Sequence, residues 1–92
     1  MKSGAGNENS FLEFPCDFPI KVMGKAGDAF DMLVMSIVRK HVPDVREGAL
    51  RNRVSRRGNY IAVTITIEAQ TQEQIDAIYH DLTAHERVIM AL

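Results

Sequence analysis

The segment from Tyr60 to Ile67 restricts the fold more than any other, because a large aliphatic side chain recurs at every second position. Successive side chains of a β-strand point to opposite faces of a sheet, so this spacing gives a strand one apolar and one solvated face. The apolar face would carry the aliphatic members of the segment, Ile61, Val63, Ile65 and Ile67. We therefore predict a central strand with one buried face.

A helix is predicted over residues 29 to about 41. Its apolar residues recur at helical spacing and would form one stripe, made up of Phe30, Leu33, Val34, Ile37 and Val38. Asp28 is the expected N-cap residue, because its carboxylate can accept a free amide of the first turn. Pro43 closes the segment, since proline cannot continue a helix. Met32 and Met35 lie off the stripe, so we expect them to be partly buried or on the surface.

Two more strands are predicted on either side of this helix. The first covers residues 18–23 and ends at Gly24, with the apolar residues Phe18, Ile20 and Val22 on one side. The second covers residues 49–55, where Leu50, Asn52 and Val54 would share the buried face. The turn at residues 57–59 contains a glycine and an asparagine, which tolerate positive φ, and it joins this strand to the central one as a hairpin.

A second helix and a last strand complete the pattern. Thr71 is the expected N-cap residue of the helix, and Gln74 three positions later completes a capping box. The apolar stripe that follows is Ile75, Ile78, Tyr79 and Leu82. In residues 87–92, Val88, Met90 and Leu92 alternate with Arg87, Ile89 and Ala91, which predicts a final strand.

The element order is therefore βαββαβ, which is typical of the ferredoxin-like α+β fold. Right-handed crossovers would place both helices on one face of a four-stranded antiparallel sheet with the strand order 4-1-3-2. Residues 11–92 are expected to form a single domain, and residues 1–10 a disordered tail. The sheet face opposite the helices, which we call the open face, is expected to carry Lys21, Met23, Arg51, Arg53, Tyr60, Thr64, Thr66, Arg87 and Ile89.

The composition argues against several activities. Cys16 is the only cysteine, so an internal disulfide or a thiolate metal site is excluded and a cytosolic location is expected. The chain has no apolar stretch that could cross a membrane. Its histidines have neither metal-ligand spacing nor a neighbouring nucleophile, so we expect no metal, no cofactor and no catalytic activity.

Cations and glycines are concentrated at two connections. Residues 24–28, G-K-A-G-D, precede a helix N-terminus and could bind a small ligand through Gly24, Lys25, Gly27 and Asp28, although a plain tight connection needs the same residues. Five arginines but a single acidic residue stand between Arg46 and Arg57. The candidate partner-binding residues are Lys21, Arg51, Arg53, Arg57, Asn59 and Tyr60.

The same cations could also bind nucleic acid, but the sequence supports this interpretation less well than ligand or protein binding. RNA-binding domains of this element order stack bases on aromatic side chains of the open face. Their consensus requires aromatic residues at the positions that Asn59, Ile61 and Thr64 hold here. Since none of these is aromatic, we expect at most weak binding of nucleic acid.

Several short motifs resemble those of the YbeD family of small, functionally uncharacterised bacterial proteins. They are L-E-F-P, K-V-M-G, R-G-N-Y leading into V-T-I-T-I, and V-x-M-x-L at the end of the sequence. The resemblance implies a ferredoxin-like fold similar to that of ACT regulatory domains. Those domains bind small ligands such as amino acids at the connection that corresponds to residues 24–28, often across a dimer interface. Members are often encoded beside lipoate-attachment enzymes.

Three functions follow as expectations. The first is a non-enzymatic regulatory or ligand-sensing module, which would bind a small-molecule ligand and could form a homodimer. The second is a protein-binding adaptor that uses the open face or an edge of the sheet, at the second or the fourth strand. Weak nucleic-acid binding is the third.

Overall fold

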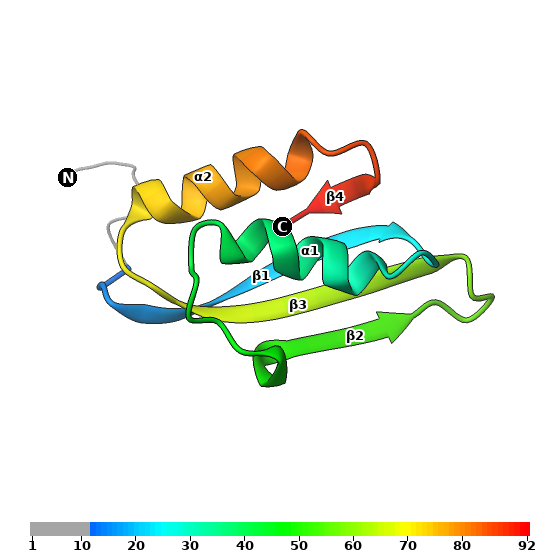
Figure 1. Cartoon of the computed structure of the whole chain (residues 1–92), viewed down its shortest axis with the longest axis horizontal. Helices are drawn as coiled ribbons and strands as arrows, with labels where there is room; N and C mark the ends of the chain where they lie inside the picture. The colour runs from blue at the N-terminus through cyan, green and yellow to red at the C-terminus, as the bar shows by residue number, and fades with distance from the viewer. Residues whose placement is uncertain (1–11) are drawn as a thin grey trace.

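The structure, a computed structural model, describes residues 12–92, so the predicted tail over residues 1–10 lies outside the described residues. Its elements follow in the order β1 (Cys16–Lys25), α1 (Phe30–Arg39), a short 3-10 helix η2 (Glu47–Ala49), β2 (Leu50–Val54), β3 (Tyr60–Ala69), α2 (Gln72–Thr83) and β4 (Val88–Ala91). The strands form one antiparallel sheet in the order β2-β3-β1-β4, with both helices on the same side (Figure 1). This order is the predicted 4-1-3-2 read from the other edge, so the fold prediction is confirmed.

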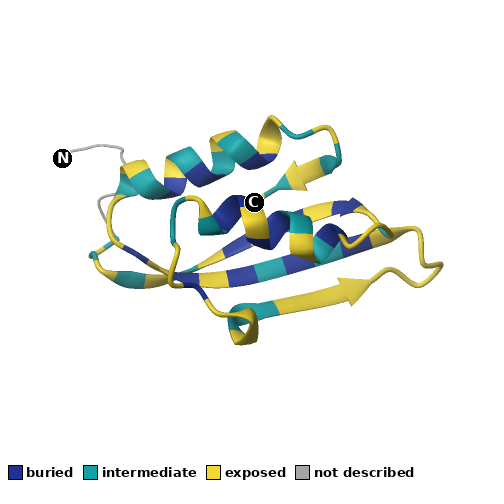
Figure 2. Cartoon of the chain, viewed as in Figure 1, coloured by how far each residue is buried: buried dark blue, intermediate teal, exposed yellow. Residues whose placement is uncertain are grey.

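The core lies between the sheet and the two helices. Ile61, Val63, Ile65 and Ile67 of β3 are buried, which confirms the predicted central strand. They pack with the apolar stripes of α1 and α2, and the buried and exposed residues alternate along β1 and β3 (Figure 2). Burial of this apolar surface, at about 25 cal/mol per Å², is the main force that holds the layers together.

The start of α1 differs from the prediction. Ala29, not Asp28, is the N-cap residue, and it supplies no side-chain cap. Asp28 and Ala29 both adopt left-handed backbone, with φ of 51° and 52°, whereas an N-cap residue is normally extended. The carboxylate of Asp31 accepts the amide of Met32 instead, at 2.9 Å. The helix also ends at Arg39, short of the predicted boundary, and Met35 is fully buried although it was predicted to lie off the stripe.

The N-terminus of α2 is close to the prediction. Thr71 Oγ1 accepts a hydrogen bond from the Gln74 amide at 3.0 Å, so the expected cap is present. The reciprocal bond is displaced by one residue, because Gln74 Oε1 accepts the amide of Gln70 at 2.8 Å. The two bonds together fix the direction in which the chain leaves β3.

The predicted buried face of β2 is wrong. Only Leu50 is half-buried, and Val54 remains 51% exposed (Figure 2). The helices lie over β1 and β3, and α1 meets this edge strand through the contact of Asp31 with Asn52, whose Nδ2 lies 3.3 Å from Asp31 Oδ2. Alternation in an edge strand therefore did not translate into burial.

A bulge in β4 overturns the predicted assignment of its side chains. Met23 pairs with Met90 but Gly24 pairs with Val88, so Ile89 is an extra residue on the β4 side. Beyond the bulge, Leu92 is hydrogen-bonded to Lys21, its amide donating to the Lys21 carbonyl at 2.7 Å. Because Lys21 and Met23 belong to the open face, Met90 and Leu92 lie there too, whereas the alternation had placed Ile89 there. Arg87 was also predicted on that face, but it precedes β4 and its guanidinium group lies over the ring of Phe30 on α1.

Candidate binding surfaces

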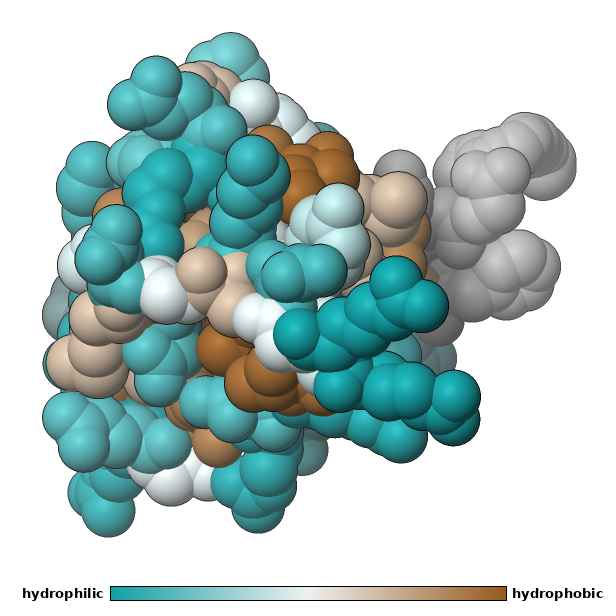
Figure 3. Space-filling view, turned by 90° about the vertical axis from the view of Figure 1, so that its right-hand side faces the viewer, coloured by the Kyte–Doolittle hydropathy of each residue, from teal (hydrophilic) through white to brown (hydrophobic). Residues whose placement is uncertain are grey.

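The two connections singled out in the sequence lie at the same end of the molecule. Lys25 is the cross-strand partner of Tyr60, and the amide of Ala26 donates to the carbonyl of Asn59 at 2.9 Å. The hairpin tip, the β1–α1 loop and the turn before β4 meet at this end (Figure 1). Seen from that side, the surface is mainly hydrophilic with hydrophobic residues between (Figure 3).

Gly24 and Lys25 are part of β1, not of the loop that follows it. Gly24 is buried, and a Cβ atom there would lie 2.4 Å from Cζ of Phe30 and 2.7 Å from the carbonyl oxygen of Arg87. The glycine thus makes room for the Phe30 ring. A ligand-binding role for Gly24, Lys25, Gly27 and Asp28 stays a prediction.

The loop itself is held by Arg87, which the sequence analysis had placed on the open face. Its guanidinium group donates to the carbonyl of Gly27 at 2.6 Å and to that of Asp28 at 3.0 Å. It also lies over the Phe30 ring, 5.5 Å from the centroid. No local pattern could have revealed this contact, because Arg87 follows Asp28 by 59 positions. Arg87 is therefore a positioning residue for the loop.

Amides at the start of α1 already have acceptors. The Phe30 amide donates to the Gly27 carbonyl at 3.2 Å, and the Met32 amide is bonded to the Asp31 carboxylate. Beside the loop is a solvent-open hollow of about 460 Å³, lined by Lys25, Ala26, Asp28, Glu86, Arg87 and Ile89. A ligand at this end would meet charged side chains of both signs rather than a cradle of free amides.

The open face carries a cluster of exposed apolar side chains. The pairing of β3, β1 and β4 sets Ala62, Met23 and Met90 in one row across the sheet. Met23, Tyr60, Met90 and Leu92 are each 39% to 71% exposed. Two hollows, of about 130 and 440 Å³, share Met23 and Ala62 as lining residues. We call Met23, Tyr60, Met90 and Leu92 the apolar patch.

Cations border the apolar patch. Arg53 is opposite Ala62 and Arg51 is opposite Thr64, which is itself paired with Lys21. Arg51 donates to the carbonyl oxygens of Gly48 at 2.9 Å and Leu50 at 3.2 Å, so its guanidinium group is held near the edge of β2. The predicted partner-binding cations Lys21, Arg51 and Arg53 therefore share one face, while Arg57 lies at the hairpin tip.

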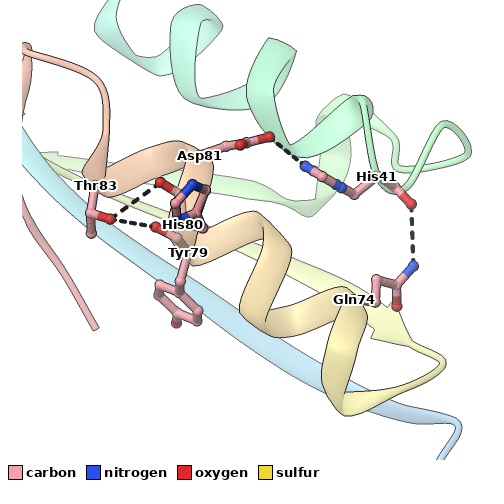
Figure 4. A network of polar contacts seen from close by, with 6 residues as sticks. All are labelled: His41, Gln74, Tyr79, His80, Asp81 and Thr83. Carbon is pink, nitrogen blue, oxygen red and sulfur yellow. Dashed lines mark hydrogen bonds and ion pairs between the residues drawn. The ribbon is translucent and has the colours of Figure 1, made fainter.

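On the other side of the molecule, His41 and Asp81 link the two helices. His41 Nε2 lies 2.7 Å from Asp81 Oδ2, and the His41 carbonyl accepts from Gln74 at 3.2 Å (Figure 4). The hydrogen bond from His41 lowers the pKa of Asp81. These contacts hold the end of α1 against the surface of α2 and have a structural role.

Tyr79 ties α2 to the last strand. Its hydroxyl donates to the carbonyl of Leu92, and its ring meets that of Phe18 edge to face at 6.5 Å. Burial raises the pKa of Tyr79, and the backbone of Lys21 offsets part of that rise.

Within residues 12–92, no three histidine, cysteine or acidic residues are grouped so that they could hold a metal ion. No helix in that range is long and apolar enough to span a bilayer.

Known proteins share both the sequence and the fold. Residues 9–92 match the family described as a protein of unknown function, DUF493. A UPF0250 protein of Nitrosomonas europaea is 45% identical over 85 residues, which cover 92% of this chain and 98% of that one. A UPF0250 protein of Neisseria meningitidis serogroup A is 43% identical over 86 residues, 94% of each chain.

A solved structure supports the fold alone. The solution structure of protein HP0495 from H. pylori superposes with a TM-score of 0.67 and covers 97% of each chain, at 12% identity. The family matches confirm the resemblance to the small, uncharacterised bacterial proteins of the YbeD type. The chain belongs to the DUF493 family of proteins of unknown function, to which it is matched over residues 9–92.

Proposed function

We propose that this protein is a non-enzymatic regulatory module that binds a partner protein on the open face of its sheet. The observation that carries the proposal is the apolar patch, because Met23, Met90 and Leu92 lie on a face that neither helix of residues 12–92 covers (Figure 1). Contiguous exposed apolar side chains on a small soluble domain typically mark an interaction site. Two of the four are methionines, whose flexible side chains adapt to a partner's shape.

The charges around the patch indicate the kind of partner. Lys21, Arg51 and Arg53 border it, so a matching surface has an apolar centre with acidic residues on one side. Apolar residues at the centre of an interface supply most of the affinity, while charges at its rim steer association and set specificity. The acidic partner would therefore associate faster at low salt.

The absence of catalysis is part of the proposal, and one observation from the sequence and one from the structure support it. Cys16 is the only thiol, and the one close pair of a histidine and a carboxylate in the described residues, His41 with Asp81, ties two helices together. A cytosolic location is likewise a prediction that the single cysteine supports.

Site-specific photocrosslinking in the native host tests the open face. A photoreactive amino acid at position 90 is expected to capture a defined partner, and the Arg51→Glu, Arg53→Glu variant is expected to weaken that capture. Position 32 is the matched control, because Met32 and Met90 are 49% and 48% exposed but Met32 lies on α1. The same products from both positions, or none from position 90, would contradict the proposal.

Ligand sensing at the loop end is the second candidate. The hollow of about 460 Å³ beside the loop places Lys25 and Arg87 near Asp28 and Glu86, a charge arrangement that suits a small zwitterion such as an amino acid. A ligand at a hundredfold excess over its Kd stabilises a fold by about 2.7 kcal/mol. Thermal shifts with amino acids and lipoyl compounds, compared between Lys25→Ala and the control Lys21→Ala, test it. Equal shifts in both variants, or no shift in the wild type, would argue against this site.

A further inference from the structure

We propose that the free edge of β2 binds an acidic, extended segment of a partner protein as a fifth strand of the sheet. The proposal goes beyond the open-face function, because it concerns the backbone at the sheet's edge. β2 is the outermost strand in the order β2-β3-β1-β4. Arg51, Asn52, Arg53 and Val54 are all exposed, so neither a helix nor a loop of the described residues covers this edge (Figure 2).

The hydrogen-bond pattern shows which backbone groups face outward. The Ser55 amide donates to the Tyr60 carbonyl at 2.8 Å, so Ser55 belongs to a hydrogen-bonded pair with β3. Since such pairs alternate along an antiparallel ladder, Arg53 and Arg51 also bond to β3. The residues that alternate with them in β2 present their amides and carbonyls to the outside. Those residues are Leu50, Asn52 and Val54.

Two of these three residues are open to a new strand. The Leu50 amide already donates to the Glu47 carbonyl, and the Leu50 carbonyl accepts from Arg51 at 3.2 Å. Asn52 and Val54 keep an amide and a carbonyl each that no described residue bonds. An unpaired strand edge of this kind is a ready template for pairing with another extended chain.

The side chains of β2 select the character of that chain. Arg51 and Arg53 both point to the open face and lie two residues apart, a spacing of about 7 Å along a strand. A partner strand that carries acidic residues at alternate positions would set one opposite each arginine. On the helix side Val54 is 51% exposed, so the residue of the partner that lies opposite Val54 would be apolar. Asn52 also lies on that side and contacts Asp31, so the position opposite it can be polar.

The same arginines disfavour a second copy of this chain as the occupant. Two β2 strands related by a two-fold axis through residue 51, 52 or 53 would place Arg51 or Arg53 directly opposite an arginine of the other copy. Like charges at directly opposed positions destabilise a strand pair, and cations on edge strands are a common defence against self-association. The charge pattern therefore favours a foreign acidic strand over a homodimer at this edge.

Short synthetic peptides test the proposal on the whole protein. The probe is a fluorescent seven-residue peptide in which glutamate alternates with valine, and two matched controls differ from it in one respect each. One has lysine in place of glutamate, and the other keeps the glutamates but carries N-methyl groups on the valine amides, which are the amides that would donate to β2. We expect each control to bind at least about tenfold more weakly. Amide hydrogen exchange at Asn52 and Val54 is expected to slow when the probe binds.

Charge reversal in the protein gives the complementary measurement. The Arg51→Glu, Arg53→Glu variant is expected to prefer the lysine peptide, and that gain of binding shows that the variant is folded. A Met23→Ser, Met90→Ser variant is expected to bind the acidic peptide as the wild type does, although it would lose the open-face partner, so the two proposals can fail separately.

Several outcomes would overturn the edge-strand proposal. Equal binding of the N-methylated peptide would show that charge alone is responsible, as would displacement of the probe by single-stranded RNA together with insensitivity to N-methylation. An unchanged preference in the charge-reversed variant, or no binding of the acidic peptide at millimolar concentration, would also reject it.

Discussion

The guanidinium group of Arg87 lies over the ring of Phe30, 5.5 Å from its centroid, and also donates to the Gly27 and Asp28 carbonyls. It thereby joins the turn before β4 to the loop that leads into α1. That loop has three consecutive residues with positive φ, namely Gly27, Asp28 and Ala29. A loop with so little regular structure of its own depends on a contact from outside it.

Replacing Arg87 by lysine is expected to loosen the loop. Lysine keeps the charge but lacks the planar fork that reaches two carbonyl oxygens at once. We expect a loss of about 1 kcal/mol in the free energy of unfolding and faster amide exchange at Ala26 and Phe30. Arg57→Lys at the exposed hairpin tip is the control and should change neither quantity. Unaltered exchange in Arg87→Lys would show that the loop holds its shape without this contact.

Gly24→Ala is expected to destabilise the protein by about 1 to 3 kcal/mol, because the new methyl group would collide with the Phe30 ring and with backbone at Arg87. Gly48→Ala is the matched control, since beyond the adjacent chain no atom of the described residues lies within 4 Å of its added Cβ, and its effect should stay within about 0.5 kcal/mol. Urea denaturation of the two variants measures the difference. Equal midpoints would mean that the Phe30 ring can move aside at little cost.

Ala29→Gly is expected to stabilise the fold by about 1 kcal/mol, because a left-handed backbone is strained for alanine and not for glycine. Ala84, the C-cap residue of α2, is also an exposed alanine beside a helix but has a φ of −77°. There the same change should destabilise by up to about 1 kcal/mol. Opposite signs in thermal unfolding would support the loop geometry, and a destabilised Ala29→Gly variant would refute it.

Asp81→Asn is expected to alter the dependence of stability on acid. The pKa of Asp81 is lowered in the folded state by the hydrogen bond from His41, below its ordinary value of 3.8. Its contribution is therefore fully present above pH 3.8 and disappears as the pH falls through the folded pKa. Wild type and Asp81→Asn should differ in unfolding free energy at about pH 5.5 and converge in stronger acid.

Asp44→Asn removes an exposed carboxylate that has no hydrogen bond among the described residues, so it is the control for this titration. A constant difference between wild type and Asp81→Asn across the acid range would show that the His41 contact does not favour the ionised carboxylate.

Tyr79 can be titrated alone in a Tyr60→Phe variant, because the chain has two tyrosines. Burial raises the pKa of Tyr79, so its phenolate absorbance should appear with a midpoint above 10.0. The stabilisation linked to this raised pKa is complete below pH 10 and is lost as the pH rises through the folded pKa. A midpoint at or below 10.0 would mean that the ring is more solvated than its contact with Phe18 implies.

The sequence predicted what burial imposes locally. The alternation in β3 and the stripe of α1 were correct because each reflects an apolar face that packs on the core. The prediction of a buried face for β2 was wrong, because burial there also needs a helix that covers the strand. The helices lie over β1 and β3, and α1 contacts β2 at its margin, through Asp31 and Asn52. Neighbour patterns in a strand cannot report which elements lie above it.

The candidate sites were predicted in part. The sequence placed Lys21, Arg51 and Arg53 on one face, and the pairing of β1, β2 and β3 brings them together there. It missed Met90 because a bulge changes the side of every later residue without altering the alternation itself. It also missed the role of Arg87, whose partners are distant in the chain and are backbone oxygens that carry no sequence signal.

The extra residue in β4 has a consequence for how this strand can change in length. Ile89 stands between Met90 and Val88, which pair with the adjacent residues Met23 and Gly24. A deletion of Ile89 would leave those pairings intact and turn the bulge into a regular ladder. Deleting Ala91 instead would shift Leu92 by one position and turn its side chain from the open face to the helix side. Position 89 is therefore the place where β4 can tolerate the loss of a residue.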